Sequence, residues 1–155
     1  MSQVSRMLDD EHRQHLALLG QLEAALARRG DPTLPGLMQR FGEAMARDVE
    51  RHFAFEEESL FPRLADAGDE GIALLLGEEH AALREVAADL RAPVQAAAEG
   101  RLTEADWPQL KRDTLEWVER QVAHIQKETM ALLPLLDDLL DDDADRELAF
   151  AYAAL

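Results

Sequence analysis

The sequence predicts an all-α fold: an up-down-up-down four-helix bundle with a short C-terminal helical tail. Leucine and alanine dominate its apolar residues, whereas the β-branched and aromatic residues that favour strands are scarce. Glycine and proline divide the chain into four long segments whose apolar residues recur with the period of a helix. Because short connections join neighbouring antiparallel helices, we expect one domain over residues 1–155, with the bundle at about 5–140.

The first two helices are bounded by glycine and proline. The first begins near Ser5 and ends at the Gly-Asp-Pro turn of residues 30–32. The second begins after Pro35 and ends at Gly68. Side chains recurring at steps of three and four residues mark one inward face on each helix. These stripes are Leu8, His12, His15, Leu19, Leu22 and Leu26 on the first helix, and Phe41, Met45, Asp48 or Val49, His52, Glu56, Leu60 and Leu64 on the second.

The third and fourth helices carry similar stripes. The third starts near Asp69 and is over by Gly100, and we expect Pro93 to disturb it. The fourth opens at Thr103–Asp106 and runs to about Leu140. The stripes are Ala73, Leu76, His80, Leu83, Ala87, Leu90 and Val94 on the third, and Leu110, Thr114, Trp117, Gln121, His124, Glu128, Ala131 and Leu135 on the fourth. All five histidines of the chain therefore lie on predicted inward faces.

The C-terminal segment, residues 137–155, differs from the helices before it. Asp137–Asp145 is an acidic run, which we expect to be solvated and partly ordered. The apolar tail that follows, Leu148–Leu155, is expected to pack on the bundle or on a second copy of the chain, so the protein is a monomer or a homodimer.

Charge and composition exclude several function classes. The formal net charge of -16 would repel nucleic acid and an anionic membrane surface. No apolar run is long enough to span a bilayer, and the N-terminal residues do not resemble a secretion signal. The absence of cysteine excludes disulfides, iron–sulfur clusters and thiol catalysis. We expect a cytoplasmic protein.

The chain contains an internal repeat of a helix pair. The motif His-x3-Glu occurs at residues 52–56 and 124–128, and in both places a proline follows ten residues after the histidine. The preceding helices match as well, because the Asp-Glu-His of residues 10–12 resembles the Glu-Glu-His of residues 78–80. Each half of the chain therefore supplies one histidine and one His-x3-Glu pair.

Six of these side chains form a candidate metal site: His12, His52, Glu56, His80, His124 and Glu128. A histidine and a glutamate four residues apart share one helix face, so both pairs can point into the bundle core. A buried glutamate without a partner costs several kcal/mol, and no basic residue on the stripes neutralises Glu56 or Glu128. Two divalent cations bridged by both carboxylates would remove this cost. Imidazole and carboxylate ligands without sulfur suit iron, manganese or zinc.

Residues next to the candidate ligands have open roles. His15, one turn beyond His12, is a candidate additional ligand, a group that orients a ligand, a proton shuttle or a core histidine. Asp48 and Gln121 each precede a ligand histidine by about one turn and could hold its second ring nitrogen, although Asp48 equally fits an exposed face. Glu57 and Glu58 are expected to face solvent.

The order of the six candidate ligands resembles the hemerythrin-like cation-binding (HHE) domain family, whose name reflects its repeated His-His-Glu pattern. The resemblance spans about Met7 to Leu136, and the stretch ending in Leu60-Phe61-Pro62 is similar to the segment that follows the ligands in that family. It implies a hemerythrin-like bundle with a non-haem di-iron centre, oxo- or hydroxo-bridged. The four histidines would be terminal ligands and the two glutamates would bridge the ions. Zinc or manganese could substitute for iron in this ligand set.

The resemblance also implies a function. A di-iron protein of this kind would bind a small diatomic ligand, O2 or NO, or peroxide, for sensing, buffering or delivery. Oxygen-carrying hemerythrins use two histidines a turn apart on the third helix, but here Leu76 stands one turn before His80. The chain also resembles the di-iron domain of bacterial proteins that repair iron centres after nitric oxide or oxidative damage, which usually carry cysteines. An enzyme acting on nitric oxide or peroxide therefore stays open as the alternative, and a bundle that has lost its metal is disfavoured by the intact ligand set.

Overall fold

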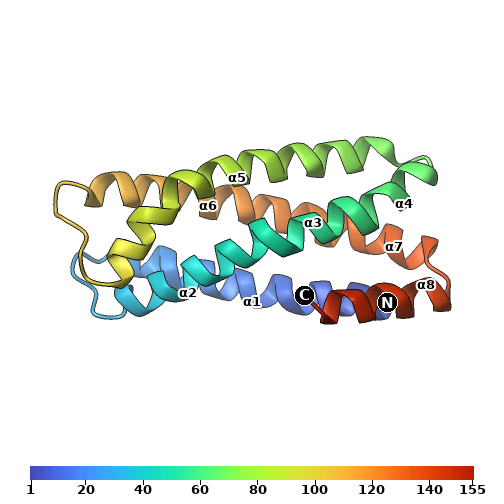
Figure 1. The fold of residues 1–155 in the computed structure, drawn as a ribbon, viewed down its shortest axis with the longest axis horizontal. Coiled ribbons are helices and arrows are strands. Elements are labelled where there is room, and N and C mark those ends of the chain that lie inside the picture. Colours follow the sequence, from blue (N-terminus) through green and yellow to red (C-terminus); the bar gives the residue numbers. More distant parts are fainter.

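The computed structural model describes residues 1–155, which form helices and no strands. The helices are α1 (Gln3–Leu26), α2 (Leu34–Arg47), α3 (Phe53–Phe55), α4 (Phe61–Asp66), α5 (Glu70–Ala98), α6 (Trp107–Lys127), α7 (Leu133–Leu139) and α8 (Asp142–Ala153). Three π-helical turns, Asp48–His52, Glu56–Leu60 and Glu128–Leu132, join α2, α3 and α4 into one continuous rod and α6 and α7 into another. Figure 1 shows these two rods alternating in direction with α1 and α5, while α8 folds back along α1. The predicted four-helix bundle with a helical tail is confirmed.

The helix boundaries differ from the predicted ones by a few residues. α1 begins at Gln3 rather than near Ser5. α2 begins at Leu34, so Pro35 lies in the first turn, where its missing N–H leaves no hydrogen bond unmade. α5 continues through Pro93, and its last turns bend out of line with the rest of the helix (Figure 1).

The acidic run near the C-terminus is mostly helical, and most of its side chains are exposed, as expected, but two of its carboxylates bond to the start of α1. Asp145 of α8 accepts hydrogen bonds from the backbone N–H groups of Gln3 at 2.8 Å and Val4 at 3.0 Å. Asp137 accepts one from the N–H of Ser2 at 2.8 Å. The first turn of a helix carries N–H groups without helical partners and a partial positive charge. These carboxylates therefore fasten the start of α1 to the C-terminal segment.

The prolines of the internal repeat, Pro62 and Pro134, each follow a π-helical turn. In both turns the backbone N–H of the residue just before the proline donates a hydrogen bond to the carbonyl five residues back. This carbonyl belongs to Glu56 in one turn and to Glu128 in the other. A proline inside a helix crowds the carbonyl four residues before it, and the wider turn accommodates this carbonyl. The repeated spacing between histidine and proline therefore has a structural cause.

The π-helical turn before α7 also changes which face of its rod is buried. An uninterrupted α-helix predicts Ala131 and Leu135 on the inward stripe, but both are only half-buried. Leu132 and Leu136 are fully buried in their place. A π-helical turn contains one more residue than an α-helical turn, so the stripe advances by one position. The two predicted core positions are wrong for this reason.

Two apolar clusters fill the bundle, one on each side of a polar layer. One cluster comprises 20 buried residues, including Phe41 and Trp117, and the other comprises 14, including Leu8 and Leu76. Tyr152 of α8 belongs to the second cluster, so the C-terminal tail packs on its own bundle. None of the helices combines the length and hydropathy that crossing a membrane would require.

Candidate metal centre

The polar layer brings together all six side chains that the sequence suggests as metal ligands. Glu56, His80, His124 and Glu128 each place a donor atom within 4.8 Å of the others, and His12, His52 and Glu128 form a second such group. All six side chains are buried. They come from α1, from α5 and from the two continuous rods, α2–α4 and α6–α7. The expected convergence of the two His-x3-Glu pairs with one further histidine from each remaining helix is present.

Both glutamates of the layer face both groups of histidines. Glu128 Oε1 lies 2.5 Å from His124 Nε2, and Glu128 Oε2 lies 3.9 Å from His12 Nε2. Glu56 Oε1 lies 2.5 Å from His52 Nε2, although Glu56 is also part of the group that contains His124. A carboxylate in this position can offer one oxygen to each of two ions.

Each histidine of the layer has a polar neighbour at its outward nitrogen, Nδ1. These distances are 3.0 Å from His12 to Thr129 Oγ1, 3.3 Å from His52 to Glu11 Oε2, 3.6 Å from His80 to Glu57 Oε1, and 2.9 Å from His124 to Glu79 Oε1. Such outer neighbours orient metal-binding imidazoles and select their tautomer. The Nε2 atoms point inward, and those of His80 and His124 approach to 3.0 Å.

The outer neighbours follow the internal repeat. Glu11 and Glu79 each precede a candidate ligand histidine, and each contacts the histidine of the following His-x3-Glu pair. Glu57 and Thr129 each follow a glutamate of the layer, and each contacts a histidine from the other half of the chain. The glutamate before each repeated histidine was visible in the sequence, but its partner lies on another helix and could not be identified there.

Two basic side chains pair with these outer carboxylates. Arg84 Nη2 lies 2.6 Å from Glu57 Oε1, and Lys127 Nζ pairs with Glu79 Oε2. Glu57 is therefore half-buried between Arg84 and His80, and the expectation that it faces solvent is wrong. Glu58 is exposed, as expected.

Asp48, Gln121 and His15 lie beside the layer. Gln121 Nε2 donates a hydrogen bond to Asp48 Oδ2 at 3.1 Å, so neither side chain holds the outward nitrogen of a ligand histidine. Asp48 is buried, which excludes its placement on an exposed face. His15 Nε2 lies 3.6 Å from Glu11 Oε1 and 3.7 Å from Asp48 Oδ1, outside both groups of candidate ligands.

The ionisation of the layer without metal follows from its burial. Burial and the charge of Glu128 raise the pKa of Glu56 well above its usual value. Burial has the same tendency at Glu128, but the neighbouring carboxyl of Glu56 and the charge of His124 hold the pKa of Glu128 well below its usual value. Burial lowers the pKa of His80 to about 3. Burial also acts against protonation of His124, but the charges of Glu128 and Glu56 and the hydrogen bonds to Glu128 and Glu79 together outweigh it and raise the pKa of His124 to about 9. Protons therefore supply the positive charge in the metal-free layer at neutral pH.

The residues of the layer fit bound metal cations. His12 Nε2, both carboxylate oxygens of Glu56 and Glu128 Oε2 are buried without a partner in hydrogen-bonding geometry. Polar atoms buried in this way are costly unless something binds them. The donors are nitrogen and oxygen without sulfur, a set that suits iron, manganese and zinc.

Aromatic rings enclose the histidines of the layer. Phe53 stacks on His80 with ring centroids 4.1 Å apart, and Phe61 lies 5.4 Å from the same ring. The hydroxyl of Tyr152 lies 3.4 Å from His52 Nδ1. Met130, two residues after Glu128, is 80% exposed and does not contribute. These rings keep water from the layer and so strengthen its internal electrostatic interactions.

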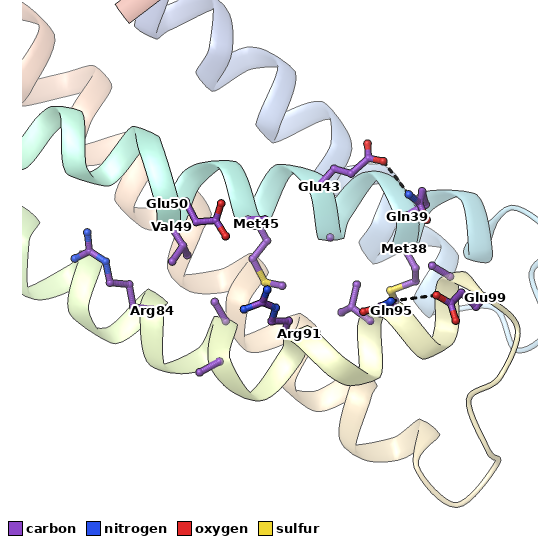
Figure 2. A pocket seen from close by; sticks show the side chains of 16 residues that line it. Met38, Gln39, Glu43, Met45, Val49, Glu50, Arg84, Arg91, Gln95 and Glu99 are labelled. Atoms are coloured by element: carbon purple, nitrogen blue, oxygen red, sulfur yellow. Dashed lines mark hydrogen bonds between the residues drawn. The ribbon is translucent and has the colours of Figure 1, made fainter. Parts of the chain in front are cut away.

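A groove of about 550 Å³ lies on the outside of the bundle between α2 and α5 (Figure 2). It is lined by side chains such as Met38, Met45 and Arg91, and none of the six candidate ligands borders it. The groove is therefore separate from the polar layer.

Comparison with known proteins agrees with the geometry of the layer. The sequence model of the hemerythrin HHE cation binding domain matches residues 3–136, which include all six candidate ligands and exclude α8. No curated protein and no solved structure matches the chain. Because the match covers most of the 155 residues, the chain belongs to the hemerythrin HHE cation-binding domain family.

Proposed function

We propose that this protein holds two iron ions in its polar layer and binds O2, NO or peroxide there, for sensing, buffering or delivery. The observation that carries the proposal is the pair of buried glutamates, each facing two groups of inward imidazole nitrogens. His80 and His124 would bind one ion, His12 and His52 the other, and the glutamates would bridge them. Zinc or manganese could occupy the same ligands.

The chain's own residues would determine what reaches the ions. Iron ions bound by so few protein donors keep open positions at which a small molecule can be activated or held. The side chains of the six ligands are at most 6% exposed, which favours a ligand of two atoms or little more. Glu11 and Glu79 would keep the Nε2 atoms of His52 and His124 directed inward. We also propose a cytoplasmic location, consistent with an acidic chain that lacks cysteine.

An anaerobic iron titration of the metal-free protein tests the proposal. We expect two iron ions to bind tightly per chain, with near-ultraviolet bands of a bridged pair appearing on exposure to air. The double variant Glu56→Ala, Glu128→Ala should lose both features. Weak binding without a defined stoichiometry, or equal binding by the double variant, would refute the di-iron assignment.

A second measurement separates binding from the enzyme alternative. A visible band that disappears when oxygen is removed, and returns when it is restored, would support reversible binding. Many turnovers of peroxide or nitric oxide per chain would instead support an enzyme, or a protein that repairs iron centres after damage by these molecules.

A further inference from the structure

A second cluster of metal-binding side chains lies beside the polar layer, between α1 and the start of the π-helical turn after α2. It consists of the carboxylates of Glu11 and Asp48, which form a group with His52 of the layer with donor atoms within 4.8 Å of one another, and of His15, whose ring approaches both carboxylates. His15 Nε2 lies 3.6 Å from Glu11 Oε1 and 3.7 Å from Asp48 Oδ1. Donor atoms around a tetrahedral zinc ion are about 3.4 Å apart, so His15 Nε2 lies close to the ligating separation from each of the two carboxylates.

Asp48 is the member of the cluster that most requires a cation. Its side chain is 5% exposed, and its Oδ1, which faces His15, is buried without a hydrogen-bond partner. Gln121 Nε2 donates to the other oxygen, Oδ2, and thereby orients Oδ1 toward the cluster. A buried carboxylate oxygen without a partner is costly, and a bound cation would remove that cost.

Space for a further ligand is present next to the cluster. A cavity of about 10 Å³ is bordered by His15, Asp48 and Gln121, among apolar side chains. This is close to the volume that one water molecule needs. A water there would complete a set of four ligands together with one imidazole and two carboxylates.

The charges around the cluster favour a cation. Glu11 and Asp48 contribute two carboxylates, whereas the basic group nearest to them is Arg47, whose Nε lies 4.0 Å from Glu11 Oε1. The Arg47 side chain is 57% exposed, so solvent screens its charge, and it has no ion pair with Asp48. The remaining neighbour, His52, faces Glu11 through Nδ1.

The internal repeat indicates that the cluster is not needed to build the polar layer. Glu79 corresponds to Glu11 in the repeat and contacts His124 as Glu11 contacts His52. The position corresponding to His15 is Leu83, a buried apolar residue. The second half of the chain therefore orients His124 without a second imidazole or a buried aspartate. His15 and Asp48 of the first half have no counterparts there, so orienting a ligand histidine does not explain them.

We propose that Glu11, His15 and Asp48 bind a third cation, a single divalent transition-metal ion, at a site next to the polar layer. The mixed nitrogen and oxygen donors suit zinc, iron, cobalt or manganese rather than calcium. Glu11 would bind this ion through Oε1 and keep Oε2 at His52, so the ion would also stabilise the orientation of that histidine. This site does not depend on whether the layer itself holds metal.

Equilibrium dialysis of the full chain against zinc, with elemental analysis, tests this site. We expect three zinc ions per wild-type chain and two in each of His15→Gln and Asp48→Asn. Asp10→Asn changes an exposed acid next to Glu11 in the sequence and should keep three ions. Circular dichroism of each variant checks that the helices are retained.

The double variant Glu56→Ala, Glu128→Ala separates this proposal from the proposed function. It should lose the two ions of the layer and keep one, and adding His15→Gln should remove that one. Two zinc ions in both the wild type and His15→Gln would overturn the third site while leaving the pair intact. Three ions in the wild type that persist in both His15→Gln and Asp48→Asn would overturn it as well.

Discussion

The outer carboxylate at His124 gives the sharpest prediction about the polar layer. Glu79 Oε1 lies 2.9 Å from His124 Nδ1, and its other oxygen pairs with Lys127. Replacing Glu79 with glutamine keeps the shape of the side chain but removes the charge that supports the imidazole. Loss of such an outer partner costs about 10–100-fold in metal affinity, which corresponds to about 1.4–2.7 kcal/mol.

The structure places the expected loss at the lower end of this range. Glu79 is 22% exposed, so its interaction with His124 is partly screened by solvent. The hydrogen bond that Glu79 accepts from His124 also helps to raise the pKa of His124 to about 9. Glu79→Gln should therefore lower this pKa and reduce competition from protons at neutral pH, which offsets part of the loss. We expect the affinity for the more weakly held ion of the pair to fall about tenfold.

Competition between the metal-free protein and a chelator, under anaerobic conditions, measures this affinity. Histidine NMR of the metal-free protein should show the accompanying decrease in the His124 pKa. Glu78→Gln is the matched control, because Glu78 is exposed and adjacent in the sequence. An unchanged affinity and an unchanged pKa in Glu79→Gln, or the same loss in Glu78→Gln, would refute the assigned role of Glu79.

Four further predictions concern pH, metal affinity and stability. Because the pKa of His124 is raised from 6.5 to about 9, its protonation should stabilise the metal-free protein most below pH 6.5, and urea unfolding should show this contribution disappearing as the pH rises through 9. Metal affinity should rise over the same window, with proton release that a pH indicator detects, and a pH-independent affinity would contradict this. Asp145→Ala removes the acceptor for two N–H groups at the start of α1 and should cost about 1 kcal/mol in urea unfolding, whereas the exposed Asp138→Ala should cost little. Leu76→Ala, at a fully buried position, should lower the free energy of unfolding by about 2–5 kcal/mol, and a smaller loss would mean that the cavity collapses.

Much of the bundle and of the candidate site could be predicted because helical periodicity is a local property. Residues such as His12 and Leu8 fall on one face of a helix wherever that helix is placed, so their burial follows from spacing alone. The same reasoning failed at Ala131 and Leu135, since it assumed an uninterrupted α-helix through Glu128. The π-helical turn there depends on which carbonyl each N–H reaches, and apolar spacing does not report that choice.

The sequence by itself determined the helical class, the four rods and the six side chains that point into the polar layer. Only the tertiary structure decided which side chains meet across rods: Glu11 with His52, Glu57 with His80, and Asp48 with Gln121. The physical reason is that an inward face is set by bonds within one helix. A contact between helices depends instead on the relative rotation and register of two rods, which the packing of the whole bundle sets.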